Sequence, residues 1–152
     1  MATECICTLL FGGANWVHIL LSAIAQHLLG WLWYEGIFSS IFAYYFAADK
    51  GVKRAEHARV RYSHTLCVVG TFFAGIARAL TIYALVKNLK LTTVYEYQEA
   101  AILVAAAIGI GYHHSFWGQR PFALLAVNGG YELGASLLGA LVLFSLVGVN
   151  FF

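Results

Sequence analysis

Four long apolar stretches alternate with short polar segments along the chain. A transmembrane helix needs about 20 mostly apolar residues, because each residue rises about 1.5 Å and the hydrocarbon layer is roughly 30 Å thick. Four stretches meet this length, and they lie at about 12–34, 62–86, 97–116 and 121–149. This pattern predicts an all-α polytopic membrane protein that forms a bundle of four transmembrane helices.

The segment after the first stretch, EGIFSSIFAYYFAADKG, is too apolar and aromatic for an ordinary loop. Together with the preceding Trp31, Trp33 and Tyr34, it has the composition of an aromatic belt at the membrane surface. We therefore expect a short interfacial helix after the first span. A rival assignment moves that span to 26–48 and buries Glu35 near the bilayer centre. The first assignment is preferred because Glu35 then lies near water.

The overall composition agrees with a membrane domain. Of the 152 residues, 61% are hydrophobic and only 11% are charged, and the chain has one proline. A soluble domain of this length needs far more polar surface to cover its core. We expect a single integral membrane domain, 1–152, that is surrounded by membrane lipids and binds no nucleic acid.

The basic residues predict the orientation of the spans. Five lie between the first and second spans and Arg120 lies between the third and fourth, whereas the opposite side has Lys87 and Lys90. Because loops rich in Lys and Arg stay in the cytoplasm, both termini are expected on the non-cytoplasmic side. The N-terminal tail has no basic residue before its apolar run, so we expect the first span to be retained.

Two motifs resemble a known family. They are LGWLWYEGIFSSIF near the end of the first span and RPFALLAVNGGYELGASLLGA at the start of the fourth. They resemble the domain-of-unknown-function 1761 family of small bacterial and fungal membrane proteins, in which an LWY-type motif ends the first span. That family's Asn- or Asp-containing motif ending in Gly-Tyr matches Asn128, Gly130 and Tyr131. In place of the Ser-Pro that often follows LWY, this chain has Glu35-Gly36. The resemblance implies a fold with about four spans and assigns no activity.

Two charged residues stand out deep inside predicted spans, where a charge costs roughly 2.5–3.5 kcal/mol at the centre and is usually paired or faces a cavity. Arg78 and Glu132 are both expected about 13 Å from the outer surface. We therefore predict a bidentate ion pair between them. Asn128, one turn below Glu132, and Tyr131 beside it are expected as further hydrogen-bond donors. The pair either fixes the helix arrangement or borders a wet cavity as a gate or ion-coordinating site.

Small residues recur four positions apart in the fourth span, at Gly130 and Gly134 and again at Ala135 and Gly139. Residues at this spacing share a helix face and let another helix approach closely, which drives association in membranes. We expect this face to pack against a helix of the same chain or of a neighbouring protomer.

His27 and His113 are predicted at similar depths in the first and third spans. Bis-histidine haem ligation or a proton relay needs such an arrangement. However, His113 and the adjacent His114 cannot both face one partner, and the chain has no Cys-x-x-Cys or His-x-x-x-His spacing. We therefore expect no metal site and no cofactor, with haem kept as an alternative.

The sequence has no Gly-x-Ser-x-Gly motif and no phosphate-binding loop, and its extramembrane segments are too short to hold an active site. We therefore expect no enzyme. The small-residue faces and many aromatic residues favour a packing or scaffold role in a homo-oligomer or as a subunit of a larger membrane assembly. The alternatives are a small channel or transporter, with Arg78 and Glu132 bordering the path, and a haem-binding redox subunit.

Overall fold

The computed structural model describes residues 12–59 and 63–147, and this part of the chain is helical with no strand. Helix α2 (Trp16–Trp31) continues into a π-helix, η1 (Leu32–Ile37), and is followed by α3 (Ser39–Asp49) and the short α4 (Ala55–Arg59). The second half comprises α5 (His64–Leu89), α6 (Val94–Gly111), α7 (His113–Trp117) and α8 (Phe122–Ser145).

Four helical segments are long and apolar enough to cross a membrane, namely Trp16–Ile37, Thr65–Leu89, Val94–Trp117 and Phe122–Ser145. They confirm the predicted four-span helical fold. Within the described residues, the observed ends differ from the predicted ones by a few residues. The predicted ends at 62 and 149 lie outside the described residues. The first span is shifted toward the C-terminus, because its helix starts only at Trp16 and η1 carries it to Ile37.

Short polar side chains set where several of the helices begin. The Asn15 side chain accepts a hydrogen bond from the Val17 backbone N–H at the start of α2. Ser63 caps α5 in the same manner. Thr93 and Glu96 form a capping box at the start of α6, in which each side chain accepts from the other's backbone N–H. These caps satisfy backbone donors that the first helical turn leaves free.

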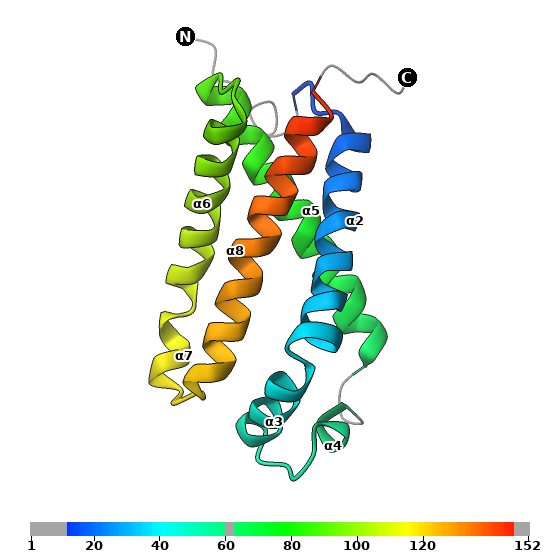
Figure 1. The fold of residues 1–152 in the computed structure, drawn as a ribbon, viewed down its shortest axis with the longest axis vertical. Coiled ribbons are helices and arrows are strands. Elements are labelled where there is room, and N and C mark those ends of the chain that lie inside the picture. Colours follow the sequence, from blue (N-terminus) through cyan, green and yellow to red (C-terminus); the bar gives the residue numbers. More distant parts are fainter. Residues whose placement is uncertain (1–11, 60–62, 148–152) are drawn as a thin grey trace.

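Helix α8 lies in the middle of the bundle and contacts each of the other three long helices. In Figure 1, α6 flanks α8 on one side and α2 on the other, while α5 crosses behind them. The beginning of α2 and the end of α8 lie at one end of the bundle, beside the connection from α5 to α6. Helices α3, α4 and α7 lie at the opposite end.

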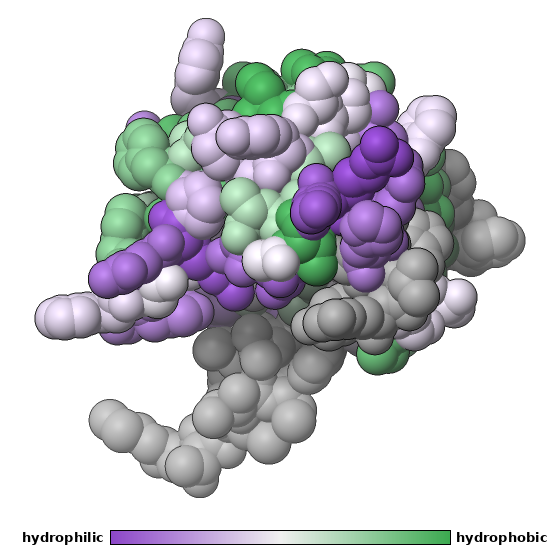
Figure 2. Space-filling view, turned by 90° about the horizontal axis from the view of Figure 1, so that it is seen from below, coloured by the Kyte–Doolittle hydropathy of each residue, from purple (hydrophilic) through white to green (hydrophobic). Residues whose placement is uncertain are grey.

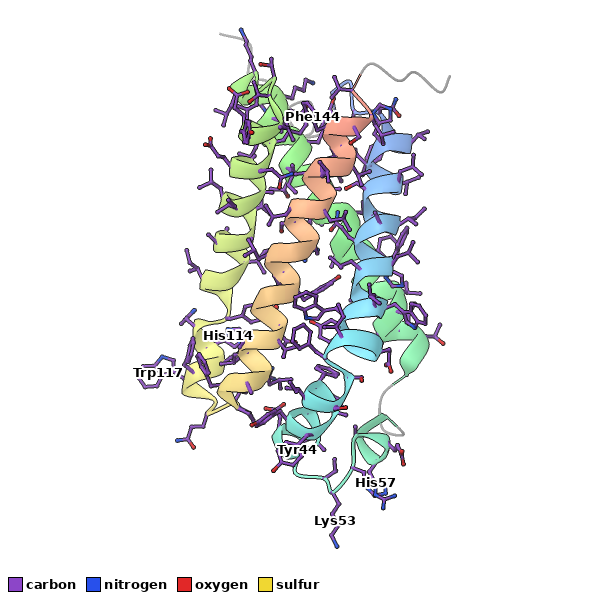
Figure 3. The ribbon with its side chains drawn as sticks, in the orientation of Figure 1. Tyr44, Lys53, His57, His114, Trp117 and Phe144 are labelled. Atoms are coloured by element: carbon purple, nitrogen blue, oxygen red, sulfur yellow. The ribbon has the colours of Figure 1, made fainter. Side chains whose placement is uncertain are left out.

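The apolar core occupies the end of the bundle where α5 meets α6. It is built from α5, α6 and α8 by the buried residues Ile82, Val86, Tyr97, Ala100, Ala101, Val104, Ala140 and Leu143. Phe144 packs against this cluster, and Figure 3 shows it near that end of the bundle. At the opposite end, Lys53 and His57 lie beside α3 and α4 (Figure 3).

Viewed from the end with α3, α4 and α7, the surface has patches of hydrophilic residues beside hydrophobic ones (Figure 2). The last residue of α3, Asp49, forms an ion pair with Arg120 just before α8, with 3.6 Å between Oδ1 and Nε. This contact joins α3 to the α7–α8 connection.

Helix α3 is the short helix that the aromatic segment after the first span predicts. Its position along a membrane surface remains a prediction.

Candidate functional site

A polar network occupies the interior of the bundle, with Arg78 and Glu132 at its centre. Arg78 of α5 donates from Nη2 to Oε2 of Glu132 on α8, forming an ion pair. The side chains of Arg78 and Glu132 are only 5% and 15% exposed. Because a buried charge without a partner is strongly destabilising, this contact accounts for how two charged groups persist between apolar helices.

The predicted bidentate geometry is wrong, because Arg78 divides its donors between two helices. Its Nη1 donates to Oε1 of Gln26 on α2, at 2.9 Å. Gln26 in turn donates to the Ser22 hydroxyl at 3.1 Å, and Ser22 donates to the Gly139 carbonyl at 3.0 Å. The planar guanidinium has five N–H groups, so it can bind a carboxylate and an amide at once.

Two tyrosines complete the surroundings of the ion pair. Tyr112, which caps the end of α6, donates from its hydroxyl to Oε1 of Glu132 at 3.3 Å. The ring of Tyr131 lies 5.8 Å from the Arg78 guanidinium carbon, within the range of a cation–π contact. Through Gln26, Arg78, Tyr112 and Glu132, a single polar network touches all four membrane-length segments.

A lateral groove of about 620 Å³ runs between α5 and α6 and reaches this network. Arg78 and Glu132 both line it, and most of its remaining wall is apolar. The small side chains of Ala77 on α5 and Ala107 on α6 are exposed in the structure and leave the space between the helices open. The ion pair is therefore bordered by a groove whose walls are mostly hydrocarbon.

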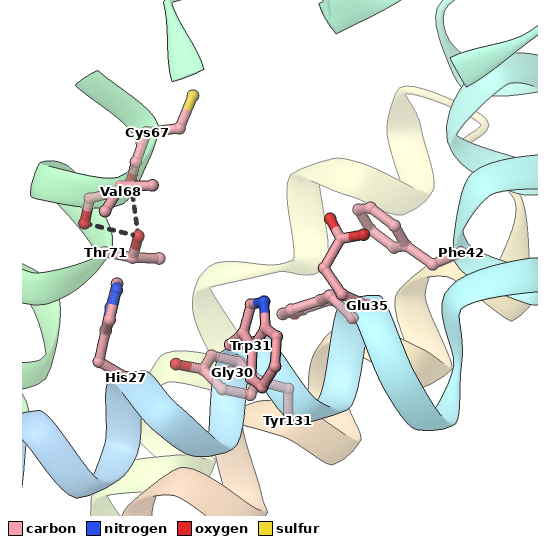
Figure 4. A pocket seen from close by; sticks show the side chains of 10 residues that line it. His27, Gly30, Trp31, Glu35, Phe42, Cys67, Val68, Thr71 and Tyr131 are labelled. Carbon is pink, nitrogen blue, oxygen red and sulfur yellow. Dashed lines mark hydrogen bonds between the residues drawn. The ribbon is translucent and has the colours of Figure 1, made fainter. Parts of the chain in front are cut away.

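A second pocket, of about 720 Å³, lies where α2 and η1 face α5. Figure 4 shows His27, Trp31 and Glu35 on one side of it and Cys67 and Thr71 on the other. Tyr131 lines this pocket, whereas Arg78 and Glu132 line the groove between α5 and α6. The groove therefore reaches the polar network between α5 and α6, whereas the pocket reaches it between α2 and α5.

The two motifs that the sequence singles out contact each other. Trp33 of η1 donates from its indole N–H to the Val127 carbonyl at 3.0 Å. Tyr34 donates from its hydroxyl to Oδ1 of Asn128 at 3.1 Å. Asn128 therefore acts as an acceptor for Tyr34, which corrects its predicted role as a donor near Glu132. Its position one turn below Glu132 on α8 brings it level with η1.

A family model described as "Protein of unknown function (DUF1761)" matches residues 17–144. The chain belongs to this family. No curated protein and no solved structure matches the chain. In this DUF1761 chain, the LWY motif in η1 and the Asn-containing motif in α8 therefore form a single contact region next to the Arg78–Glu132 pair.

The glycines of α8 differ in how closely the neighbouring groups approach. A Cβ on Gly139 would lie 2.6 Å from Nε2 of Gln26, and one on Gly130 would lie 3.0 Å from the Trp33 ring. By contrast, a Cβ on Gly134 would meet Leu29 at 3.7 Å, an ordinary contact distance. The fully buried Ala135 lies in the bundle interior. Of the predicted packing glycines, the first and last are thus the ones that need the absence of a side chain.

The structure gives His27 and His113 different partners. The His27 ring packs edge-on against Phe72 of α5, with 6.0 Å between ring centroids. His113 is exposed in α7, where its Nδ1 lies 3.0 Å from the Ile110 carbonyl. Among the described residues, no three His, Cys, Asp or Glu side chains are grouped as metal ligands.

The neutral members of the network were not predicted from the sequence. Ser22 and Gln26 lie four residues apart in an otherwise apolar helix, so they share a face, and both are fully buried. This spacing is the signal that could have identified them. Tyr112 and Tyr34 offered no comparable signal, because tyrosines near span ends usually form the aromatic belt.

Proposed function

We propose that this DUF1761 chain is a packing or scaffold component of a membrane assembly, acting as a homo-oligomer or as a subunit of a larger particle. The observation that carries the proposal is the polar network that joins all four membrane-length segments. Both carboxylate oxygens of Glu132 are already engaged inside the bundle, by Arg78 and Tyr112. Such a network favours one fixed helix arrangement, which a scaffold needs.

The outer face of α6 supports association with a further helix. Gly109 has open space where a Cβ would lie, and Ala106, three residues earlier on the same face, is exposed. In lipid, small residues favour close helix contacts because backbones can approach each other. A neighbouring protomer or subunit could therefore pack against this face without rearranging the bundle.

The experiment is to extract the full chain mildly from its membrane and to determine the composition of the intact particle by native mass spectrometry. We expect a particle larger than the 16.7 kDa protomer. Gly109→Leu should reduce the assembled fraction, whereas Gly70→Leu is the matched control, since Gly70 also faces open space but lies on α5. A particle that holds one protomer and nothing else would contradict the proposal.

We also propose that the end with α3, α4 and α7 faces the cytoplasm, which places both termini on the opposite side. Lys50, Lys53, Arg54 and Arg120 lie in or beside these elements, and the positive-inside rule supports this orientation. In a cysteine-free background, an impermeant maleimide added to intact cells should label Thr92→Cys and leave Lys53→Cys unlabelled. The reverse pattern would overturn the orientation.

A channel or transporter is the second candidate, because the groove between α5 and α6 reaches the Arg78–Glu132 pair. In such a protein the pair would border the path of the transported species. A flux measurement on the purified chain in liposomes separates this candidate from a scaffold.

A further inference from the structure

The groove between α5 and α6 places charged groups where only membrane-soluble molecules arrive from the side. Arg78 lies near the middle of the segment Thr65–Leu89, so the floor of the groove is close to the bilayer centre. Its walls include Ala77, Leu103 and Ala107, which are apolar and exposed. A phospholipid headgroup stays at the surface, because moving its charges to this depth is costly.

The charges in the floor of the groove neutralise each other. Arg78 and Glu132 form an ion pair, and they are the only charged residues among the described ones that line this groove. A ligand with a net charge would therefore add an uncompensated charge in a medium of low polarity. The floor thus favours a neutral molecule.

The floor also has hydrogen-bond donors that no group in the described structure uses. Both oxygens of Glu132 already accept, from Arg78 and from Tyr112. Arg78 has five N–H groups, of which the bonds to Gln26 and Glu132 use two. Its Nε is buried and has no acceptor in the described part of the chain. Nη1 and Nη2 each retain a second N–H, so a ligand that brings an acceptor can bind the guanidinium where Arg78 lines the groove.

We propose that this groove binds a neutral, membrane-soluble carbonyl compound of the quinone class. Its carbonyl oxygen accepts from the Arg78 guanidinium, while its ring and hydrocarbon tail lie between the apolar walls of α5 and α6. The groove volume of about 620 Å³ falls in the usual range for small-molecule sites. The proposal does not depend on the scaffold role, which concerns the outer contacts of the bundle.

The test uses the purified full-length chain and decylubiquinone as the probe, with bound molecules counted by native mass spectrometry over a concentration series. Dodecylbenzene, which has a similar tail but no acceptor, is the reference compound. We expect saturable binding of one decylubiquinone per protomer and no saturable binding of dodecylbenzene. Equal binding of both compounds, or no saturable binding of the quinone, would overturn the proposal.

Two matched variants locate the site. Ala107→Phe fills the groove from α6, and Gly70→Phe adds the same ring to an exposed position on α5 that does not line the groove. We expect Ala107→Phe to weaken binding about tenfold or more and Gly70→Phe to leave it unchanged. Arg78→Lys, which keeps the charge but lacks the planar fork, should also weaken binding. Unchanged binding in Ala107→Phe would place the quinone elsewhere and refute the proposal.

Discussion

Arg78 contacts three kinds of group that each favour its positive charge. The Glu132 carboxylate neutralises it, the Gln26 amide oxygen accepts a hydrogen bond at 2.9 Å, and the Tyr131 ring lies 5.8 Å away. A charge brought from water into a bundle interior loses its hydration, and these contacts replace part of it. The stability of the interior therefore depends on the whole set, with the carboxylate as its strongest member.

The first prediction tests this dependence. We expect Arg78→Ala and Glu132→Ala each to lower the free energy of unfolding by about 3–5 kcal/mol, because each leaves a buried charge unpaired. The double variant should lose less than the sum of the two. Unfolding in detergent, arranged as a double-mutant cycle, measures the coupling. Arg120→Ala combined with Glu132→Ala is the control and should be additive, since Arg120 pairs with Asp49. Additivity for Arg78 and Glu132 would contradict their coupling.

The second prediction concerns the close approach of α2 and α8. Gly139→Ala should lower the free energy of unfolding by about 1–3 kcal/mol, because the new Cβ would lie 2.6 Å from Nε2 of Gln26. Gly134→Ala is the matched control on the same helix, where the nearest atom is at 3.7 Å. It should be neutral or stabilising, since Ala favours a helix over Gly by about 1 kcal/mol. Equal effects in detergent unfolding would show that Gly139 is not a tight contact.

For single residues, the sequence predicts the partners of charged side chains better than the partners of neutral ones. A charge inside an apolar span has a large cost, so its depth and its partner can be inferred from the sequence, and Arg78 and Glu132 do meet in the structure. The choice between one bidentate partner and two separate acceptors depends on side-chain geometry that spacing does not contain. For the same reason the sequence did not assign Gln26 to Arg78 or Tyr34 to Asn128.

Among the elements, η1 forms the end of the first span and packs against α8. Its π-helical turn continues α2 without a break and presents Trp33 and Tyr34 to successive residues of α8. An aromatic series extends from this contact into α3, with Tyr34 5.2 Å from Tyr131 and 4.8 Å from Phe42 between ring centroids. The LWY motif thus fixes the end of the first span against the fourth.

The third prediction separates the two tryptophans of this motif. Trp33→Phe keeps an aromatic ring but removes the hydrogen bond to the Val127 carbonyl, so we expect a loss of about 1–2 kcal/mol in the free energy of unfolding. Trp31→Phe is the control, because Trp31 is 69% exposed, and it should change stability little. The measurement is again unfolding in detergent. A larger loss for Trp31→Phe would indicate that the indole bond does not hold η1 against α8.

The sequence predicts the long helices more completely than the irregular turns where one helix passes into the next. Hydrophobic length locates all four spans within a few residues, because the bilayer thickness sets a minimum for each. The π-helical turn at 32–37 and the break between α6 and α7 at Tyr112 were not predicted. Both depend on a shift of one residue in backbone hydrogen bonding, which a pattern of apolar positions does not record.

For the molecule as a whole, the decisive question is whether the central network only holds the helices together or also borders a path. The last prediction therefore uses Glu132→Gln, which keeps the shape of the side chain and removes its charge. Because the amide oxygen can still accept from Arg78 or Tyr112, we expect a smaller loss of stability than in Glu132→Ala and an intact particle.

A cation path should respond differently, since the field in a wall of low polarity depends on that charge. Flux of ions through purified unmodified protein in liposomes, with and without Glu132→Gln, distinguishes the two cases. We expect no flux from either form, because both oxygens of Glu132 are bound within the bundle and the groove beside them is mostly apolar. Flux through the unmodified protein that Glu132→Gln abolishes, with the particle still intact, would favour the channel over the scaffold.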